Sequence, residues 1–437
     1  MVNYLKNECC PCGKKHTVAI EDVVIGKGVC TRIRDFVQHF GAKKPFLLAD
    51  CNTFSAAGEK VSEVLEDASI PFSKYIFPAG NIEPNEQAVG AAVMHFDPSC
   101  DLIIGIGSGV INDIGKILSN MTGCKYIIVA TAPSMDGYAS ATSSMSMDGL
   151  KVSLPSRCAD MIIGDTDILK NAPEQMLKAG LGDILAKYVS IAEWRIAHII
   201  TGEYYCEQIA ALIRETVKKC VENAEGLLRR EEQAVEAVFE GLVISGIAMA
   251  YAGVSRPASG VEHYFSHIWD MRGLEFGAQV ELHGIQCAMA TLQAVKLYEE
   301  IKKLEPCKKT AKAYVDGFSY ESWKMELRNF LGNSAETMIA QEQRERKYDK
   351  STHPARFVRI KENWNEILQI IEEELPTYRQ MCDILDKVGI SKDLLSIGVD
   401  SQTAKRTFCA TKDIRDKYVL SRLAWDLGVL DVLSALL

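Results

Sequence analysis

The sequence lacks an apolar run long enough to cross a membrane. Its longest nearly uncharged apolar stretch, residues 242–254, falls short of the roughly 20 residues that a spanning helix needs. The first ten residues also lack the basic flank and apolar core of a secretion signal. We therefore expect a cytoplasmic protein with no membrane span, in which residues 242–254 form a buried helix.

An excess of basic residues is also absent. The chain has 49 Lys and Arg against 58 Asp and Glu, which gives a formal net charge of −9. Nucleic-acid affinity depends on clustered Lys and Arg, so this balance argues against a nucleic-acid partner and favours a small-molecule ligand. No internal repeat or low-complexity tract is present, and 437 residues suffice for roughly two domains with separate cores.

Cysteine, in contrast, is plentiful. The 14 cysteines are scattered through the chain, and we expect them to stay reduced in the cytoplasm. Four residues of the types that bind zinc are clustered near the start of the chain: Cys9, Cys10, Cys12 and His16. Their spacing matches no zinc finger or ribbon, so a structural zinc site and an ordinary N-terminal segment both stay open.

The first part of the sequence alternates β-like runs with helical stretches, which indicates a mainly parallel sheet covered by helices. After residue 167 the pattern changes to long amphipathic helices. We expect an α/β nucleotide-binding domain over residues 1–171 and an all-α domain over 172–437. The expected strands are 45–50, 73–77, 102–106 and 126–131; the expected helices are 53–68, 85–96, 209–228, 231–252, 280–304 and 364–375; the charged stretch 341–361 is expected to be a solvated connection.

A glycine turn follows the apolar run 102–106. Gly107 and Gly109 flank Ser108, and glycine lets a backbone approach a pyrophosphate while the N–H groups of the following helix favour its charge. The last position of the dinucleotide fingerprint is Val110 rather than Gly or Ala, so this is not an ordinary Rossmann motif. The pattern predicts either a phosphate cradle or a plain strand-to-helix turn.

Two other segments are candidates for ligand contacts. Asp50 ends an apolar strand, where a carboxylate can accept both ribose hydroxyls of an adenosine, although a helix-capping role is equally open. Residues 131–140, Thr-Ala-Pro-Ser-Met-Asp-Gly-Tyr-Ala-Ser, form a hydroxyl-rich loop after the fourth expected strand. Ligands of open α/β sheets bind beyond the carboxyl ends of the strands, so this loop is expected to reach cofactor or substrate.

The second half contains the ligand types of a metal site. Asp183 ends the segment Gly-Leu-Gly-Asp, His263 and His267 lie four residues apart, and His283 precedes a glycine. Two imidazoles and one carboxylate leave coordination positions open, which suits a catalytic zinc or another first-row divalent ion. Residues four apart share one face of a helix, so His263 and His267 are expected to face the same way.

These segments occur in the order and approximate spacing of one superfamily. The chain resembles the iron-containing alcohol dehydrogenase and dehydroquinate synthase group, and most closely its bacterial-type sn-glycerol-1-phosphate dehydrogenases. The resemblance spans nearly the whole chain and implies an α/β N-terminal nucleotide-binding domain, an all-α C-terminal domain and an active site in the cleft between them. The matching segments are 105–116, 131–140, 182–183, 259–267 and 283–284.

The resemblance also implies roles for individual residues. The metal, zinc in some members and nickel in others, would be held by Asp183, His263 and His283, with His267 beside the substrate. Asp136 matches a position that touches substrate hydroxyls in related polyol dehydrogenases. The residues implied to bind NAD(H) or NADP(H) are Asp50, Gly107, Ser108, Gly109, Asp113, Thr131, Ser134 and Ser140.

The implied reaction is the reversible reduction of dihydroxyacetone phosphate to sn-glycerol 1-phosphate by NAD(P)H, with a divalent metal polarising the C2 carbonyl. The substrate phosphate needs cations. Lys187, four residues after Asp183, and Arg256 are the candidates, although Lys187 could instead form a structural ion pair. His267 could relay a proton to the alkoxide or only position the substrate. Asp136, Lys187 and His267 are thus the expected catalytic residues.

Three alternatives stay open. A polyol dehydrogenase would share the fold, metal and cofactor but act on unphosphorylated glycerol. A catalytically silent nucleotide-binding sensor would keep the fold without turnover. A dehydroquinate synthase fits less well, because the basic and acidic pattern of its carbocyclic site is not evident. The resemblance further implies a homodimer.

Overall fold

The computed structural model describes residues 6–7, 10–80, 82–147 and 150–437. The chain divides into two compact units. Unit 1 comprises residues 1–184 and 211–254, and unit 2 comprises residues 185–210 and 255–437. The predicted boundary near residues 171–173 differs from this division, because 174–184 and 211–254 belong with the N-terminal sheet.

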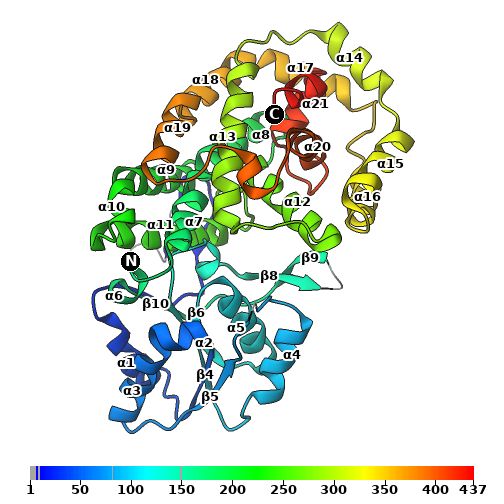
Figure 1. Cartoon of the computed structure of the whole chain (residues 1–437). Helices are drawn as coiled ribbons and strands as arrows, with labels where there is room; N and C mark the ends of the chain where they lie inside the picture. Colours follow the sequence, from blue (N-terminus) through cyan, green and yellow to red (C-terminus); the bar gives the residue numbers. More distant parts are fainter. Residues whose placement is uncertain (1–5, 8–9, 81, 148–149) are drawn as a thin grey trace. The chain divides into compact units, whose positions relative to one another are not determined.

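Unit 1 is built around a six-stranded sheet in the order β3-β10-β7-β6-β4-β5, and all of its pairings are parallel (Figure 1). The central strands are buried on both faces, which explains their continuous runs of β-branched and other apolar residues. The six strands are β3 (Asp22–Gly26), β4 (Pro45–Asp50), β5 (Ser73–Phe77), β6 (Leu102–Gly107), β7 (Lys125–Ala130) and β10 (Met161–Asp165).

Helices cover both faces of the sheet. Side chains alternate along a strand, so Leu47 and Ile104 pack with Val61 on one face, whereas Gly105 and Tyr126 meet α5 on the other. The helices of unit 1 are η2 (Val29–Arg32), α1 (Ile33–His39), α2 (Cys51–Thr53), η3 (Phe54–Gly58), α3 (Glu59–Asp67), α4 (Glu86–His95), α5 (Gly109–Thr122), η4 (Gly137–Ala139), α6 (Thr166–Leu169), α7 (Glu174–Leu185), α10 (Ala224–Leu228) and α11 (Glu232–Ala252). Helix α9 (Glu207–Glu222) contributes its residues from 211 onward.

The four predicted strands are confirmed to within one residue at either end. The sequence pattern did not indicate β3 and β10, nor the two antiparallel pairs β1 (Lys6–Asn7) with β2 (His16–Thr17) and β8 (Thr142–Met147) with β9 (Leu150–Pro155). The predicted helix over 53–68 is divided into α2, the π-helical turn η3 and α3. Short pairs such as β1–β2 carry too few residues for a clear alternating pattern.

Contrary to the expectation that no apolar run is long enough, helix α11 could cross a membrane by its length and composition alone. However, 78% of its most apolar window is buried inside the molecule. Phe239 packs against Gly164 of β10, where a Cβ would lie 2.2 Å from its ring, and it also contacts Tyr138. The burial agrees with the expectation that residues 242–254 contribute to a core helix.

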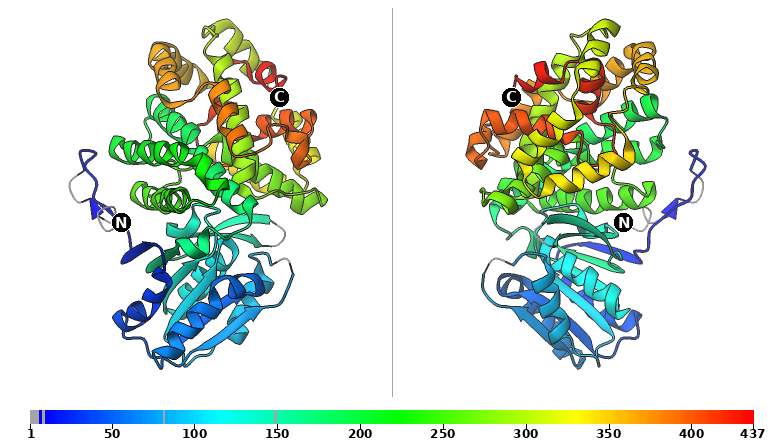
Figure 2. Two further views of the ribbon diagram at one scale, coloured as in Figure 1. Left: turned by 60° about the vertical axis from the view of Figure 1, so that its left-hand side comes forward. Right: turned by 90° about the vertical axis from the view of Figure 1, so that its right-hand side faces the viewer.

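Unit 2, all of whose residues are described, contains helices and no strand (Figure 2). The predicted helices over 280–304 and 364–375 correspond to α13 and α18. The helices are α8 (Lys187–Thr201), α12 (Val261–Phe276), α13 (His283–Ile301), α14 (Lys308–Gly317), α15 (Tyr320–Leu331), α16 (Ser334–Glu345), α17 (His353–Glu362), α18 (Trp364–Glu374), α19 (Tyr378–Lys387), η5 (Leu394–Ile397), α20 (Ser401–Thr411), α21 (Leu420–Leu427) and α22 (Leu430–Ser434).

The prediction of a solvated connection over 341–361 is wrong. The stretch contains the end of α16 and most of α17, joined by a short turn in which Tyr348 is buried. Tyr348 donates to Asp413 at 2.5 Å, and the Lys347 ammonium donates to the carbonyl of Arg415. The high charge density hid a helix pair, because most of its charged side chains are exposed while Tyr348, Phe357 and Ile360 are buried.

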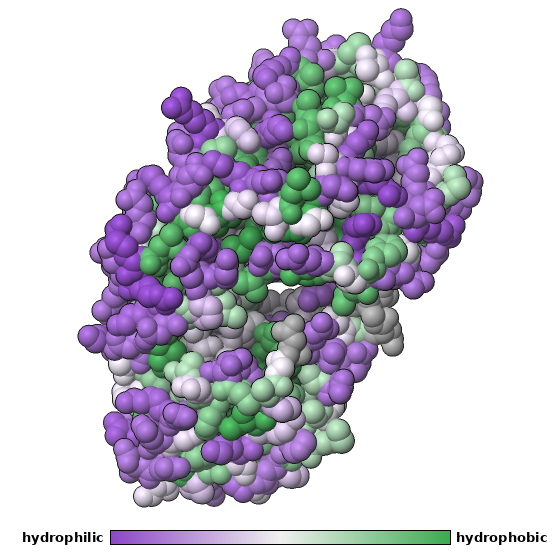
Figure 3. Space-filling view, viewed as in Figure 1, coloured by the Kyte–Doolittle hydropathy of each residue, from purple (hydrophilic) through white to green (hydrophobic). Residues whose placement is uncertain are grey.

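The surface follows the composition. Figure 3 shows hydrophilic side chains over much of the visible face of each unit. The exposed large apolar side chains are spread over several elements, for example Met121 of α5 and Met325 of α15. Single exposed apolar residues of this kind are ordinary on protein surfaces.

Candidate functional site

The carboxyl ends of three neighbouring strands form one part of the candidate site. Asp50 ends β4, Gly107 ends β6, and Thr131 directly follows β7. In the sheet, β5 lies on one side of β4, whereas β6 and then β7 lie on its other side. The direction in which successive strands are added therefore reverses between β4 and β6. Such a switch point is where open α/β sheets bind their ligands. The fold therefore brings these predicted cofactor residues to one edge.

The two glycines of the turn differ in whether packing requires glycine at their positions. A Cβ on Gly107 would lie 2.6 Å from the Cβ of Ile111, so glycine is required there for the strand to meet α5. A Cβ on Gly109 would meet only Met135, at an ordinary 3.5 Å. Packing therefore does not demand glycine at 109, the first residue of α5, where N–H groups and the helix dipole favour an anion.

The loop after β7 is tied to this turn. The hydroxyls of Ser108 and Ser134 lie 2.5 Å apart, and the N–H of Thr131 donates to the carbonyl of Gly107 at 3.1 Å. The buried Tyr138 hydroxyl donates to the carbonyl of Ala132 at 2.6 Å. Burial raises the pKa of Tyr138, so it stays a protonated donor at neutral pH. The hydroxyls of Ser134 and Tyr138 thus take part in hydrogen bonds that hold the loop together and tie it to the glycine turn.

Asp50 has the capping role that the sequence left open. Its Oδ1 accepts from the N–H groups of Asn52 and Thr53 at 2.8 and 2.9 Å, and the Thr53 hydroxyl accepts from the N–H of Asp50. This capping box starts α2. Among the described residues, Oδ2 of Asp50 accepts no hydrogen bond. The ribose contact stays a prediction, now confined to that oxygen.

Asp113 and Ser140, also predicted to bind cofactor, have partners within unit 1. Asp113 pairs with the fully buried ammonium of Lys116 at 2.9 Å. Lys116 also donates to the carbonyl of Thr142 at 2.6 Å. The Ser140 hydroxyl lies 3.0 Å from that of Thr142 and accepts from its N–H. These contacts fasten the start of β8 to α5.

Asp136 and Asp183 lie together in unit 1. The N–H of Asp136 donates to Oδ2 of Asp183 at 2.9 Å, and the hydroxyl of Ser245 donates to Oδ2 of Asp136 at 2.9 Å. Asp183 is fully buried on α7. The close approach depends on Gly180, where a Cβ would fall 1.8 Å from the carbonyl oxygen of Pro133. The predicted metal-binding carboxylate is therefore joined directly to the predicted substrate loop.

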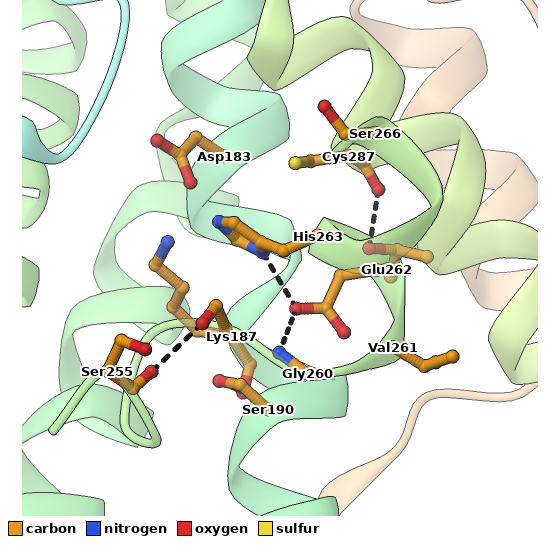
Figure 4. Close-up of polar contacts among 12 residues, drawn as sticks. Asp183, Lys187, Ser190, Ser255, Gly260, Val261, Glu262, His263, Ser266 and Cys287 are labelled. Carbon is orange, nitrogen blue, oxygen red and sulfur yellow. Dashed lines mark hydrogen bonds and ion pairs between the residues drawn. The ribbon is translucent and has the colours of Figure 1, made fainter. Parts of the chain in front are cut away.

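The predicted histidines come together in unit 2, and Figure 4 shows one of them, His263, with the Glu262 carboxylate. The rings of His263 on α12 and His283 on α13 have centroids 5.0 Å apart, and the ring of His267 is stacked on His283 at 5.8 Å. Cys287, one turn after His283, is a third donor that the sequence analysis did not single out. The ligand atoms of His263, His283 and Cys287 all lie within 4.8 Å of one another.

Hydrogen bonds orient both imidazoles in the same manner. Nδ1 of His263 donates to the Glu262 carboxylate at 2.8 Å. Nδ1 of His283 lies 2.8 Å from the hydroxyl of Ser266, which itself donates to Oε1 of Gln286 at 2.5 Å. Since the serine proton is used, Nδ1 of His283 is the donor. Both rings thus carry the Nδ1 proton and present the Nε2 lone pair, the form in which histidine binds metals.

Buried charges around the histidines are balanced by protonation. Oε1 of Glu262 accepts from the N–H of Gly260 at 2.6 Å, and Oε2 of Glu193 accepts from the N–H of Val261 at 2.9 Å. Burial, with the nearby charge of Glu262, raises the pKa of Glu193 to about 8. Glu193 is therefore protonated, and uncharged, at neutral pH.

The donor set fits a divalent metal. The Cys287 thiol adds a third donor, whose sulfur lies within 4.8 Å of the ligand atoms of both imidazoles. Glu262 and Ser266 bond to Nδ1 of the two imidazoles, so that Nε2 of each ring can face a metal ion. Imidazoles held in this way are common ligands of zinc and similar ions. The chemistry of these residues therefore supports His263 and His283 as metal ligands, whereas the part of Asp183, in unit 1, stays a prediction.

The predicted cations differ in their partners. Lys187 is buried on α8, and Figure 4 shows its ammonium and the ring of His263 extending toward the same side. Arg256 is buried and donates to Glu203 at 2.8 Å through Nε and to the carbonyl of Tyr418 at 3.0 Å. These partners explain the burial of Arg256 without a substrate. Which of the two cations would bind the substrate phosphate stays a prediction.

Sequence analysis missed several polar residues of this region. The ammonium of Lys417 donates to the carbonyl and hydroxyl of Ser259 at 2.7 and 2.6 Å. Burial, reinforced by Arg256 and Arg415, lowers the pKa of Lys417 to about 7. Lys417 offers no sequence signal. Glu193 does, because it is a lone carboxylate on an otherwise apolar helix face, and Cys287 follows His283 at helical spacing.

Comparisons with known proteins support one family. The iron-containing alcohol dehydrogenase family model matches residues 24–173. The glycerol-1-phosphate dehydrogenase [NAD(P)+] of Halalkalibacterium halodurans is 30% identical over 302 residues, covering 68% of this chain and 76% of that protein. The chain belongs to the glycerol-1-phosphate dehydrogenase family. A family member from Geobacillus stearothermophilus is 27% identical over 402 residues, covering 91% and 90% of the two chains.

The family extends beyond bacteria, and its fold is represented by more distant solved structures. The enzyme of the same name from Methanosarcina acetivorans is 33% identical, covering 63% of this chain and 76% of its own. The glycerol dehydrogenase structure from Schizosaccharomyces pombe is similar with a TM-score of 0.61 at 17% identity, covering 98% and 92% of the chains. At this identity the likeness establishes the fold, an α/β N-terminal and a helical C-terminal part.

Proposed function

We propose that this chain catalyses the reversible, NAD(P)H-dependent reduction of dihydroxyacetone phosphate to sn-glycerol 1-phosphate. The observation that carries the proposal is the pair of imidazoles, His263 and His283, whose Nδ1 atoms are both bonded so that Nε2 is presented. Relatives at 30% identity or more are glycerol-1-phosphate dehydrogenases [NAD(P)+] by name. Both facts favour metal-assisted reduction of a phosphorylated ketone.

We assign the metal, zinc or nickel, to Asp183, His263 and His283. When bound, the ion polarises the C2 carbonyl and the nicotinamide supplies the hydride. Asp183 adds the carboxylate that completes the donor set predicted by the family pattern. The assignment to Asp183 is supported by its hydrogen bond from the N–H of Asp136, which holds its carboxylate beside the predicted substrate loop.

We assign the cofactor to the strand ends of unit 1. Gly107, Ser108 and Gly109 would hold the pyrophosphate at the start of α5, and Oδ2 of Asp50 would accept a ribose hydroxyl. The loop after β7 would line the nicotinamide half. The members assigned to that half are Thr131, Ser134 and Ser140, with Asp113 supporting the turn through Lys116.

We assign the substrate to polar groups of both units. The Lys187 ammonium would bind the phosphate by a charge-assisted hydrogen bond, and Asp136 would contact a substrate hydroxyl. His267, whose ring is stacked on His283, would pass a proton to the C2 oxygen or position it. Arg256 would act indirectly on substrate binding, because its contacts with Glu203 and Tyr418 hold the surrounding segments in place.

A spectrophotometric assay of NADH oxidation tests the proposal. Dihydroxyacetone phosphate is compared with dihydroxyacetone and, in the reverse direction, sn-glycerol 1-phosphate with glycerol, each with zinc and with nickel. We expect turnover with the phosphorylated pair. Preference for glycerol would show a polyol dehydrogenase, and tight NADH binding without turnover on any of them would show a nucleotide sensor.

A further inference from the structure

The N-terminal cysteine and histidine cluster lies in unit 1, outside the residues assigned to catalysis. Strands β1 and β2 pair in antiparallel fashion, with Asn7 opposite His16, so the described residues 10–15 belong to the connection of a hairpin. Of the predicted cluster, Cys10, Cys12 and His16 belong to the described residues, whereas Cys9 lies outside them. The hairpin therefore places three zinc-type ligands within a stretch of seven residues.

The ligand atoms of these three residues converge. Sγ of Cys10, Sγ of Cys12 and a ring nitrogen of His16 lie within 4.8 Å of one another. Sγ of Cys12 is 3.3 Å from Nε2 of His16. Cys10 and His16 are buried and Cys12 is half-buried, although they stand in a hairpin of otherwise exposed residues. The convergence of three zinc-type ligand atoms is the arrangement that a bound metal ion needs.

The turn between the two cysteines is shaped to bring the thiols together. The N–H of Gly13 donates to the carbonyl of Cys10 at 3.0 Å, which closes a tight turn through Cys12. Gly13 has φ +81°, a conformation that other residues adopt only with strain. The sequence Cys-Pro-Cys-Gly thus folds back on itself with both thiols on its inner side.

His16 is oriented as a metal ligand. Its Nδ1 lies 3.2 Å from the carbonyl oxygen of Tyr251 on α11, which can only accept, so Nδ1 carries the proton. The ring is also stacked on that of Tyr251 at 5.1 Å. Nε2, on the side of Cys12, therefore presents its lone pair. At His263 and His283, too, a hydrogen bond at Nδ1 leaves Nε2 for a metal ion, but the residues that make those bonds belong to other elements.

We infer that Cys10, Cys12 and His16 bind a structural zinc ion that fastens the N-terminal hairpin to helix α11. Two thiolates and one imidazole favour zinc over magnesium or calcium. Binding releases the two thiol protons to solvent, and no redox change is involved. Structural zinc takes four ligands, so a fourth donor completes the shell. The site is separate from the histidines of unit 2 and does not rest on the proposed function.

Zinc analysis of the full-length protein tests the inference. Metal per chain is measured by mass spectrometry, and thiolate ligation by the sulfur-to-cobalt charge-transfer absorption after substitution with Co²⁺. The background variant Cys287→Ser removes the thiol near the unit 2 histidines. We expect Cys12→Ser and His16→Asn to lose one equivalent of zinc together with the charge-transfer band, and to melt at a lower temperature.

Two variants and one reagent provide the controls. His16→Cys keeps a zinc ligand and should retain the metal, whereas His16→Asn should not. Cys124→Ser, in the same unit, should leave zinc and the band unchanged. If a variant does not fold, treating the Cys287→Ser protein with a mercurial thiol reagent should release one zinc equivalent. Unchanged zinc content in Cys12→Ser and His16→Asn, or no release by the mercurial, would overturn the inference.

Discussion

The two units form their parts of the candidate site in different ways. In unit 1 the site is made by backbone: strand ends, two glycines and the first N–H groups of α5. In unit 2 it is made by buried ionisable side chains, among them His263, Glu262 and Glu193, each held by a short hydrogen bond. A backbone site is sensitive to added volume, whereas a side-chain site is sensitive to lost charge. The same kind of substitution should therefore have different consequences in the two units.

Removing an imidazole should have the largest effect, because it should abolish metal binding and turnover while leaving NADH binding unchanged. We expect His283→Ala to lose the metal and more than about 100-fold in kcat/KM, since losing even a second-shell partner of a ligand costs 10–100-fold. NADH affinity, assigned to unit 1, should stay within about twofold. Metal content, turnover and NADH titration on one preparation check this, with the exposed His39→Ala as control. A folded His283→Ala protein with full metal and activity would refute the ligand set.

Removing the buried ammonium should affect substrate alone. Lys187→Met keeps the side-chain length but loses a charge-assisted contact worth about 1.5–3 kcal/mol, so KM for dihydroxyacetone phosphate should rise on the order of ten- to a hundredfold. KM for NADH and bound metal should not change. Lys324→Met, which breaks an ion pair with Glu321 on α15, is the control. A lower melting temperature with unchanged KM would instead indicate a structural ion pair.

Adding a methyl group should distinguish the glycines of unit 1. Gly107→Ala forces a contact with Ile111 and should destabilise the protein by about 1–3 kcal/mol. Gly109→Ala has room in the protein, so its stability should be unchanged while its NADH affinity falls. Thermal melts and NADH titrations of both variants check the difference. Equal stability loss in the two would mean that packing alone explains the turn.

The protonation of Glu193 predicts a pH dependence that arises in unit 2. Its pKa is about 8 in the folded state and near 4.5 otherwise, so this stabilisation is fully present below about pH 4.5 and is lost as the pH rises toward 8. The slope is at most about 1.4 kcal/mol per pH unit. Glu193→Gln should flatten the dependence of melting temperature between pH 5.5 and 8. Parallel curves for variant and wild type would contradict the prediction.

The smallest expected effect concerns cofactor choice in unit 1. Asp50→Asn keeps an oxygen that can cap α2 but removes the charge that disfavours the 2′-phosphate of NADPH. We expect the ratio of kcat/KM for NADH to that for NADPH to fall several-fold at unchanged stability. An unaltered ratio would move the ribose contact away from Asp50.

Part of unit 1 could be predicted because β4, β6 and β7 are continuous apolar runs that are buried on both faces of the sheet. The central strands and the loop 131–140 follow directly from that pattern. The helix pair within 341–361 could not be predicted, because most of its charged side chains are exposed, as they also are in a solvated connection. In the site, His263 and His283 were predictable as ligand types, but the partnership of Ser266 with Gln286 arises only when α12 and α13 pack together.

Unit 1 is discontinuous in the sequence, and this affects the order in which it can form during synthesis. Its sheet is complete once residue 165 has emerged from the ribosome, yet Phe239 of α11 fills the space beside Gly164 and Tyr138. Until about 75 further residues have been translated, that apolar surface has no cover. The nascent chain therefore carries an exposed hydrophobic face for several seconds at roughly 5–20 residues per second, a period in which chaperone binding would protect it.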